Sequence, residues 1–135
     1  MGGAARLKLL LDTHIWLWSI RESHRLRPPV REILGDPMNE RWLSPISTWE
    51  ALTLHRKSRI HLHVDPAAWL ARAALGLRQA PITHEIARAA HQLGVSHFDP
   101  ADCLIAATAL VHDLTLVTAD ERLLQISAIK TLSNR

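Results

Sequence analysis

The stretch Leu7-Lys8-Leu9-Leu10-Leu11 is a short, mostly apolar run that stops abruptly at Asp12. A second run of the same kind, Leu114-Thr115-Leu116-Val117-Thr118, lies near the other end of the chain. Short, continuous, mostly apolar runs are typical of strands that a parallel sheet buries on both faces. We therefore predict two buried strands, one followed directly by Asp12 and the other closely followed by Asp120.

The segments between and around these two runs predict helices, because Pro, Gly and Asp punctuate apolar residues at helical spacing. Helices are expected over 15–20, 30–34, 47–57, 66–76, 81–94, 100–112 and 121–126, with further short strands at 42–44 and 129–132. This alternation predicts an α/β fold, a three-layer α/β/α sandwich with a mainly parallel central sheet. A length of 135 residues suits a single domain spanning 1–135.

Composition narrows the class of protein. Hydrophobic residues make up 47% of the chain and charged residues 21%, which is typical of a globular domain. The single cysteine, Cys103, excludes an intramolecular disulfide and a site built from several cysteines. Residues 1–6 lack the apolar core of a signal peptide, and the run 103–111 is too short to span a bilayer. We expect a cytoplasmic protein without a membrane segment, whose net charge of +3 is compatible with a nucleic-acid partner.

Five acids occupy positions where chemistry is expected. Asp12 and Asp120 follow the two predicted buried strands, and in open α/β sheets ligands bind beyond the carboxyl ends of the strands. Glu50, Asp99 and Asp102 stand at or near the starts of predicted helices. We therefore expect these carboxylates to converge at one edge of the sheet.

Each of these acids also has a structural explanation as a helix cap. Ser47 with Glu50, and Thr118 with Glu121, fit capping boxes, while Asp12 and Asp99 fit N-caps. Capping asks only for a short polar residue, and Ser, Thr or Asn would serve equally well. It does not predict carboxylates at both strand ends and also at the mouth of the apolar segment 103–111. The complete set therefore favours a functional site.

Converging carboxylates repel one another, and a divalent cation removes that repulsion. All-oxygen ligands favour Mg²⁺, or Mn²⁺ in its place, over zinc. Such an ion polarises a phosphate and activates bound water, which is the chemistry of a phosphodiester hydrolase. No paired-histidine arrangement accompanies the acids, so we expect hydrolysis that leaves a 5′-phosphate and a 3′-hydroxyl.

The acid-bearing segments resemble the PIN-domain toxins, the VapC-like ribonucleases of bacterial type II toxin–antitoxin pairs. Four blocks carry the resemblance, in the family's order: Leu9-Leu10-Leu11-Asp12-Thr13-His14, Ser44-Pro45-Ile46-Ser47-Thr48-Trp49-Glu50, Asp99-Pro100-Ala101-Asp102-Cys103-Leu104-Ile105-Ala106-Ala107 and Leu116-Val117-Thr118-Ala119-Asp120. Together they span nearly the whole chain. The resemblance implies an α/β/α PIN fold and an endoribonuclease that depends on Mg²⁺ or Mn²⁺.

The resemblance also assigns residues and partners. It maps the catalytic, metal-binding acids onto Asp12, Glu50, Asp102 and Asp120. Asp99 matches an extra acid of one subgroup, and Thr13 and Thr118 match hydroxyl positions beside the metal ligands, although both also fit local caps. The implied partners are an RNA substrate, a cognate antitoxin bound in a groove beside the site, and a second copy of the chain in a homodimer.

Other readings of the sequence are weaker or remain open. A haloacid-dehalogenase-type phosphatase needs a second aspartate where this chain has His14, and the nine histidines show no zinc-binding spacing. Trp49 is expected in the core, and one of Trp16 and Trp18 is expected to face outward. Basic clusters at 21–31 and 56–59 fit either phosphate binding or a solvated surface. A PIN-fold RNA-processing nuclease, or a non-catalytic RNA-binding module without an antitoxin, stays open as an alternative.

Overall fold

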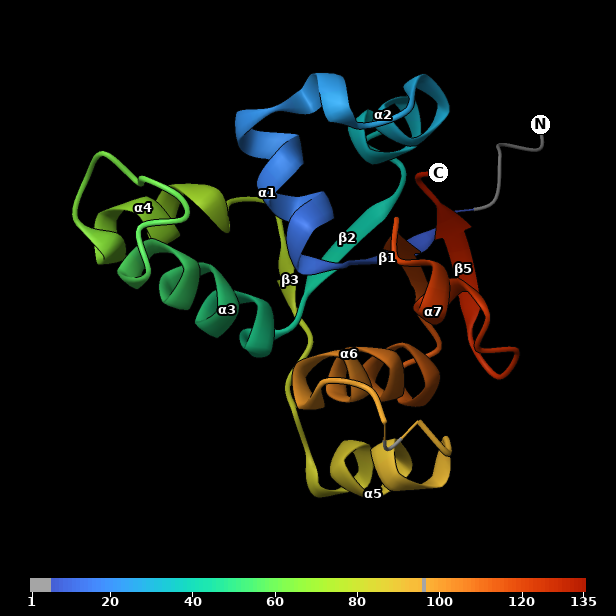
Figure 1. The fold of residues 1–135 in the computed structure, drawn as a ribbon. Coiled ribbons are helices and arrows are strands. Elements are labelled where there is room, and N and C mark those ends of the chain that lie inside the picture. Colours follow the sequence, from blue (N-terminus) through green and yellow to red (C-terminus); the bar gives the residue numbers. More distant parts are fainter. Residues whose placement is uncertain (1–5, 96) are drawn as a thin grey trace.

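The central feature of the computed structural model, which describes residues 6–95 and 97–135, is one five-stranded sheet (Figure 1). The strands are β1 (Lys8–Leu11), β2 (Glu40–Leu43), β3 (Arg78–Gln79), β4 (Thr115–Thr118) and β5 (Lys130–Ser133), and their order is β3-β2-β1-β4-β5. Every neighbouring pair is parallel. The predicted parallel α/β sheet is confirmed, with β1 and β4 side by side at its centre.

In the part of the chain that the structure describes, seven α-helices connect and cover the strands. They are α1 (Thr13–Arg21), α2 (Pro28–Gly35), α3 (Pro45–Arg56), α4 (Pro66–Ala73), α5 (His84–Gln92), α6 (Pro100–Val111) and α7 (Glu121–Leu124), with a 3₁₀ turn at Ser23–Arg25. Every predicted helix is present within the described residues, but three are shorter than expected by two or more residues. The helix expected over 121–126 ends at Leu124. The helix expected over 81–94 begins only at His84, because Thr83 is its N-cap and accepts a hydrogen bond from the Ile86 N–H. The helix expected over 66–76 ends at Ala73.

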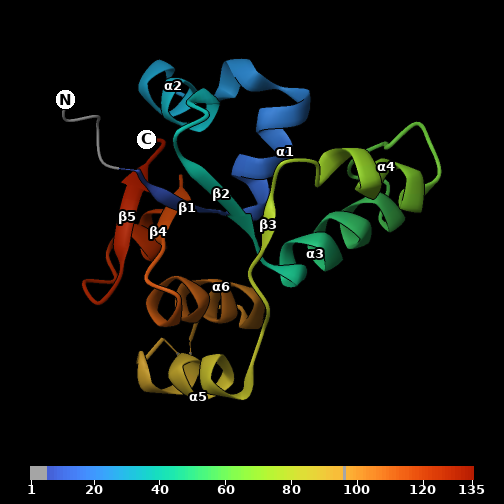
Figure 2. The ribbon, with the colours of Figure 1, turned by 180° about the vertical axis from the view of Figure 1, so that it is seen from behind.

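The helices form a layer on each face of the sheet, as the two opposite views show (Figures 1 and 2). Successive side chains of a strand point to opposite faces. Leu9 and Leu11 pack in one core with the helices α1 to α4, whereas Leu10 packs in a second core with α6 and α7. Helix α5 lies on the outer side of α6, farthest from the sheet. The expected three-layer α/β/α sandwich is therefore confirmed.

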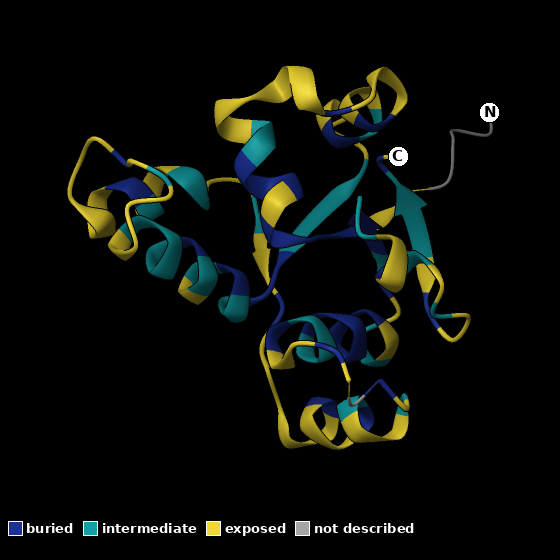
Figure 3. Cartoon of the chain, viewed as in Figure 1, coloured by how far each residue is buried: buried dark blue, intermediate teal, exposed yellow. Residues whose placement is uncertain are grey.

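The burial of the residues follows this layering. In Figure 3 the central strand β1 is mostly buried and dark blue, whereas the outer sides of the helices are exposed and yellow. The prediction for Trp49 is wrong, because its side chain lies on the outer face of α3 and is 57% exposed. Trp16 is buried and Trp18 is half-buried, so the outward residue of that pair is Trp18. Within the described residues, we find no helix with the length and apolar character that crossing a membrane requires.

Candidate active site

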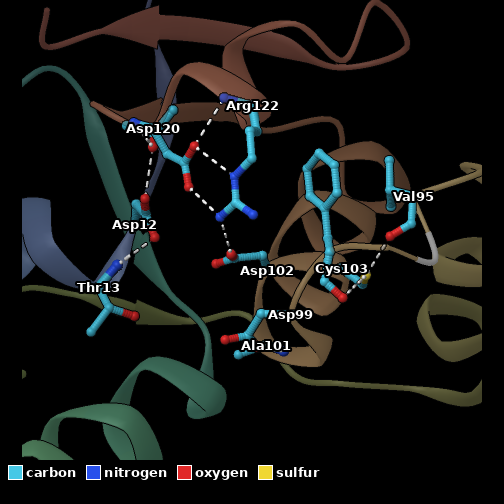
Figure 4. Close-up of polar contacts among 11 residues, drawn as sticks. Asp12, Thr13, Val95, Asp99, Ala101, Asp102, Cys103, Asp120 and Arg122 are labelled. Atoms are coloured by element: carbon cyan, nitrogen blue, oxygen red, sulfur yellow. Dashed lines mark hydrogen bonds and ion pairs between the residues drawn. The ribbon is translucent and has the colours of Figure 1, made fainter.

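The two central strands bring the first and last predicted acids to one edge of the sheet. Leu11 of β1 lies opposite Val117 of β4, and the Asp12 N–H continues the ladder by donating to the Val117 carbonyl at 3.0 Å. Asp12 therefore lies beside Thr118, and Asp120 follows two residues later (Figure 4). The N-terminal end of α6 approaches the same edge and carries Asp102 toward these residues.

A buried threonine connects the acids that follow β1 and β4. The Thr118 hydroxyl donates to Asp12 Oδ2 at 2.7 Å and accepts a hydrogen bond from the Asp120 N–H at 3.0 Å. The other oxygen of Asp12, Oδ1, accepts from the Thr13 N–H at 2.9 Å, so Asp12 is also the N-cap of α1. Asp12 therefore both caps α1 and lies close to the acid that follows β4. The capping box predicted for Thr118 and Glu121 is wrong, because Asp120 is the N-cap of α7.

Glu50 is held by a second threonine. The Thr13 hydroxyl lies 2.5 Å from Glu50 Oε1, to which it donates, and 2.8 Å from the Ser47 hydroxyl. The capping box predicted for Ser47 and Glu50 is wrong, because α3 begins at Pro45 and Ser44 is its N-cap. Glu50 therefore has no role in starting its own helix. Its contact with Thr13 directs it toward the acid-bearing edge of the sheet.

The two acids of α6 have different surroundings. Asp99 is the N-cap of α6 and accepts from the Ala101 N–H at 2.7 Å, while its side chain remains exposed. Asp102 lies in the first turn of α6 and is partly buried. The capping explanation is therefore confirmed for Asp99, whereas Asp102 faces the other acids (Figure 4).

Burial and mutual repulsion change the acidity of this group. Desolvation, followed by the charges of Asp12, Asp99, Glu50 and Asp120, raises the pKa of Asp102 to about 7. Desolvation also raises the pKa values of Asp12 and Glu50, although hydrogen bonds from Thr118 and Thr13 partly offset it. Such shifts are expected where several carboxylates share one site. The acids predicted from the sequence therefore form one electrostatically coupled group.

A basic residue that the sequence analysis missed lies against this group. The Arg122 guanidinium contacts Asp120 Oδ2 at 3.1 Å and Asp102 Oδ2 at 3.4 Å through Nη2 (Figure 4). Desolvation alone would raise the pKa of Asp120, but the hydrogen bonds and charge of Arg122 outweigh it and lower that pKa. The sequence contained one sign of this contact: Arg122 lies two residues after Asp120, in the first turn of the helix that Asp120 caps.

The donor set has the chemistry of a hard-cation site. Asp12, Glu50, Asp102 and Asp120 offer only carboxylate oxygens, which suit Mg²⁺ or Mn²⁺. Over residues 6–95 and 97–135, however, no group of three His, Cys, Asp or Glu side chains is close enough to surround one ion. The charge on Arg122 currently compensates the two carboxylates nearest to it. The residues therefore fit a divalent ion by chemistry, and binding would require their side chains to rearrange.

A groove extends from the acids along α1 and α3. Its first part has a volume of about 610 Å³, and its lining includes Glu50 and Asp99 of the acids, Thr13, and the basic residues Lys57 and Arg59. A second hollow of about 420 Å³ shares His14, Leu54 and Arg59 with the first. It continues to Trp18 and to Arg25, whose guanidinium carbon lies 4.5 Å from the Trp18 ring centroid. The groove therefore joins an acidic end to a basic, partly aromatic one.

Sequence comparison places these residues in a known family. A family profile described as the PIN domain matches residues 9–129, which include all five acids. The chain is 36% identical over 116 residues to Ribonuclease VapC22 of Mycobacterium tuberculosis, covering 85% of this chain and 88% of that protein.

Solved structures support the same fold. The chain is similar to VapBC2 from Rickettsia felis bound to a promoter DNA fragment, with a TM-score of 0.71 and 18% identity over 94% of this chain and 98% of that one. It is also similar to DNA-bound VapBC from Salmonella typhimurium, with a TM-score of 0.68 and 21% identity over 96% and 99% of the two chains. Together with the profile match and the sequence relative, this shows that the chain belongs to the PIN-domain family.

Proposed function

We propose that the protein is a divalent-metal-dependent endoribonuclease and the toxin of a type II toxin–antitoxin pair. The observation that carries this proposal is the convergence of carboxylates from four parts of the chain, with the pKa of Asp102 raised to about 7 by burial and by its acidic neighbours. Concentrated negative charge of this kind opposes direct phosphate binding unless a cation compensates it. Membership of the PIN-domain family and 36% identity to a named ribonuclease support the choice of RNA.

Some residues of this chain would bind the metal ion, and others would hold those ligands in position. Asp12, Glu50, Asp102 and Asp120 would hold Mg²⁺, or Mn²⁺ in its place, and Asp99 would add charge at the rim. When bound, the cation would polarise the phosphate and supply an activated water. Thr118 and Thr13 would hold Asp12 and Glu50 in fixed orientations through the hydrogen bonds described above. Fixed donors of this kind reduce the reorganisation that the reaction requires.

The groove beside the acids would receive the RNA. Lys57 and Arg59 are exposed, and no described residue forms an ion pair with either of them, so both can compensate phosphate charge. His14 is exposed and offers a ring on which an unpaired base can stack. Because the groove starts at the acids, a strand lying along it would present one phosphate to them.

The antitoxin would bind beside the site and extend over a second surface. A hollow of about 470 Å³ between α1, α2 and α4 has apolar walls that include Trp16, Leu34 and Trp69, with Arg31 and Arg72 also lining it. An amphipathic segment with acidic residues would fit this combination. Two neighbours in fold are VapBC assemblies bound to DNA, which supports a partner protein for this chain. We further propose a homodimer that acts in the cytoplasm.

The direct test is cleavage of a defined RNA by the purified protein with Mn²⁺ and with EDTA, followed by analysis of the fragment ends. We expect cleavage only with the metal, and fragments with a 5′-phosphate and a 3′-hydroxyl. Asp12→Asn, Glu50→Gln, Asp102→Asn and Asp120→Asn should each slow cleavage by about 10²–10³. Fragments ending in a 2′,3′-cyclic phosphate would contradict this mechanism. RNA binding without cleavage would instead indicate a binding module.

The toxin role needs a separate experiment in cells. Expression of the chain alone should slow growth, and co-expression with the adjacent small gene should restore it. Asp12→Asn, expressed to the same level, is the matched control and should not slow growth. Cleavage in vitro without any effect on growth would indicate an RNA-processing nuclease rather than a toxin.

A further inference from the structure

Arg122 makes the closest basic contacts to the acids that were assigned as metal ligands. Its Nη2 joins Asp120 Oδ2 at 3.1 Å to Asp102 Oδ2 at 3.4 Å, and its Nε lies 3.4 Å from Asp120 Oδ1 (Figure 4). One guanidinium therefore bridges two carboxylates from separate helices, α6 and α7. The planar fork of arginine suits this geometry, since it can donate in two directions at once.

The surroundings hold Arg122 in place without burying it. Its backbone N–H donates to Asp120 Oδ1 at 2.9 Å, and its guanidinium carbon lies 5.2 Å from the centroid of the Phe98 ring. The Arg122 side chain is nevertheless 56% exposed, compared with 17% for Asp102 and 28% for Asp120. The guanidinium can consequently leave the two carboxylates and enter solvent without any change in the core.

A divalent ion would need the same carboxylate oxygens. Asp102 Oδ2 and Asp120 Oδ2 both face the guanidinium, and a cation placed between them would meet its positive charge at short range. The guanidinium and a dication therefore cannot share these oxygens. The side-chain arrangement agrees with this, because the described acids do not surround an ion while Arg122 bridges two of them.

We propose that Arg122 is the internal counter-cation of the acidic cluster and that a divalent ion must displace its guanidinium to bind Asp102 and Asp120 together. The inference rests on the proposed function in one respect, the divalent ion. Arg122 stabilises the metal-free protein by compensating charge, and for the same reason it weakens the binding of metal. It thereby sets the metal concentration at which the cluster becomes loaded.

The test is the affinity for Mn²⁺ alone, measured by calorimetry on metal-stripped protein at fixed ionic strength. Arg122→Gln should bind Mn²⁺ about tenfold more tightly than the parent, because hydrogen bonds to a charged group no longer need to be broken. Arg122→Lys keeps the charge but cannot bridge both acids as a fork, so its affinity should lie between the two. Arg88→Gln on α5 makes the same charge change away from the site and should bind like the parent.

The displacement itself can be observed without any activity measurement. In an NMR titration with Mg²⁺, the Arg122 Nε–H signal of the parent should shift, while a reporter such as the Arg88 Nε–H signal stays in place. Equal Mn²⁺ affinities for the parent and Arg122→Gln would overturn the role of Arg122 and leave the metal-dependent function intact. Absence of Mn²⁺ binding by both proteins would overturn the role of Arg122 and the proposed function together.

Discussion

The Thr118 hydroxyl donates to Asp12 Oδ2 at 2.7 Å, and both residues are buried at the carboxyl ends of neighbouring strands. The same hydroxyl oxygen accepts from the Asp120 N–H at 3.0 Å. One side chain therefore fixes the orientation of the acid after β1 and the start of the turn that carries the acid after β4. Its removal should affect both acids at once.

Thr118→Val preserves the shape of the side chain and removes only this hydroxyl. We expect the free energy of unfolding to fall by about 1–3 kcal/mol, because Asp12 keeps a buried, unsatisfied oxygen. Affinity for Mn²⁺ should fall as well, since Asp12 loses its fixed orientation. Urea unfolding and calorimetry measure the two effects, and Thr118→Ser, which keeps the hydroxyl, should lie close to the parent. A loss of stability with unchanged affinity would contradict the positioning of Asp12 by Thr118.

The raised pKa of Asp102 predicts how the free energy of unfolding of the metal-free protein depends on pH. Its pKa is raised from 3.8 to about 7, first by desolvation and then by neighbouring acids. Between these values the folded protein binds a proton that the unfolded chain has lost, so the free energy of unfolding should decrease as pH rises. After allowance for solvent screening, the decrease should be about 1–2 kcal/mol between pH 4 and pH 7.

Asp102→Asn tests this assignment, because it removes the titrating group and keeps the shape. Urea unfolding of the metal-stripped variant should show a smaller decrease over the same pH interval. Asp65→Asn, which changes an exposed cap of α4, is the control and should follow the parent. Parallel curves for the parent and Asp102→Asn would exclude Asp102 as the source of the pH dependence.

The basic end of the groove predicts how RNA binding depends on salt. Lys57→Gln and Arg59→Gln should each weaken binding of a single-stranded RNA and reduce the slope of log K against log salt by about 0.7. Fluorescence anisotropy measures this in an Asp12→Asn background with EDTA, in which cleavage is too slow to interfere. Arg88→Gln, with the same charge change on α5, should leave the slope unchanged. Equal effects of all three substitutions would show that net charge, and not the groove, binds the RNA.

The strand-end acids could be predicted from the sequence because local patterns show where each strand ends and that the strands alternate with helices, as in a parallel sheet. Asp12 and Asp120 follow apolar runs, and adjacent parallel strands place their carboxyl ends together. The bridge from Arg122 to Asp102 could not be predicted, since it depends on how α6 and α7 are oriented relative to each other across β4. The two-residue strand β3 has no periodicity of its own and is defined by its pairing with β2.

Trp49 shows that the hydrophobicity of a residue does not by itself predict whether its side chain is buried. The buried face of α3 carries Ser47 and Ala51, both fully buried, four residues apart on one side of the helix. Trp49 lies two residues from each, about 200° around the helix, and is therefore directed outward. The buried face of α3 carries small side chains, and one of them, Ser47, lies 2.8 Å from the Thr13 hydroxyl. Site geometry thus decided which side of α3 is buried.

Asp12→Asn in the metal-free protein separates a metal ligand from a helix cap. Asp12 is buried, and desolvation raises its pKa, so its negative charge is unfavourable when no cation is present. Asn removes that charge, keeps one oxygen for the Thr13 N–H, and can direct its amide toward the Thr118 hydroxyl oxygen. With EDTA, the variant should be as stable as the parent or more stable by roughly 1 kcal/mol. Capping alone predicts almost no change, because Asn caps about as well as Asp.

Metal then distinguishes the two roles of Asp12. Mn²⁺ at about 100 times its dissociation constant should stabilise the parent by about 2.7 kcal/mol, because it binds the folded protein alone. Asp12→Asn should lose most of that gain, whereas Asp65→Asn, a cap outside the site, should retain it. The measurement is urea unfolding of the three proteins with EDTA and with excess Mn²⁺ at fixed ionic strength. If Mn²⁺ stabilised the parent and Asp12→Asn equally, Asp12 would be a cap and not a metal ligand, since only a ligand links the metal to the stability of the fold.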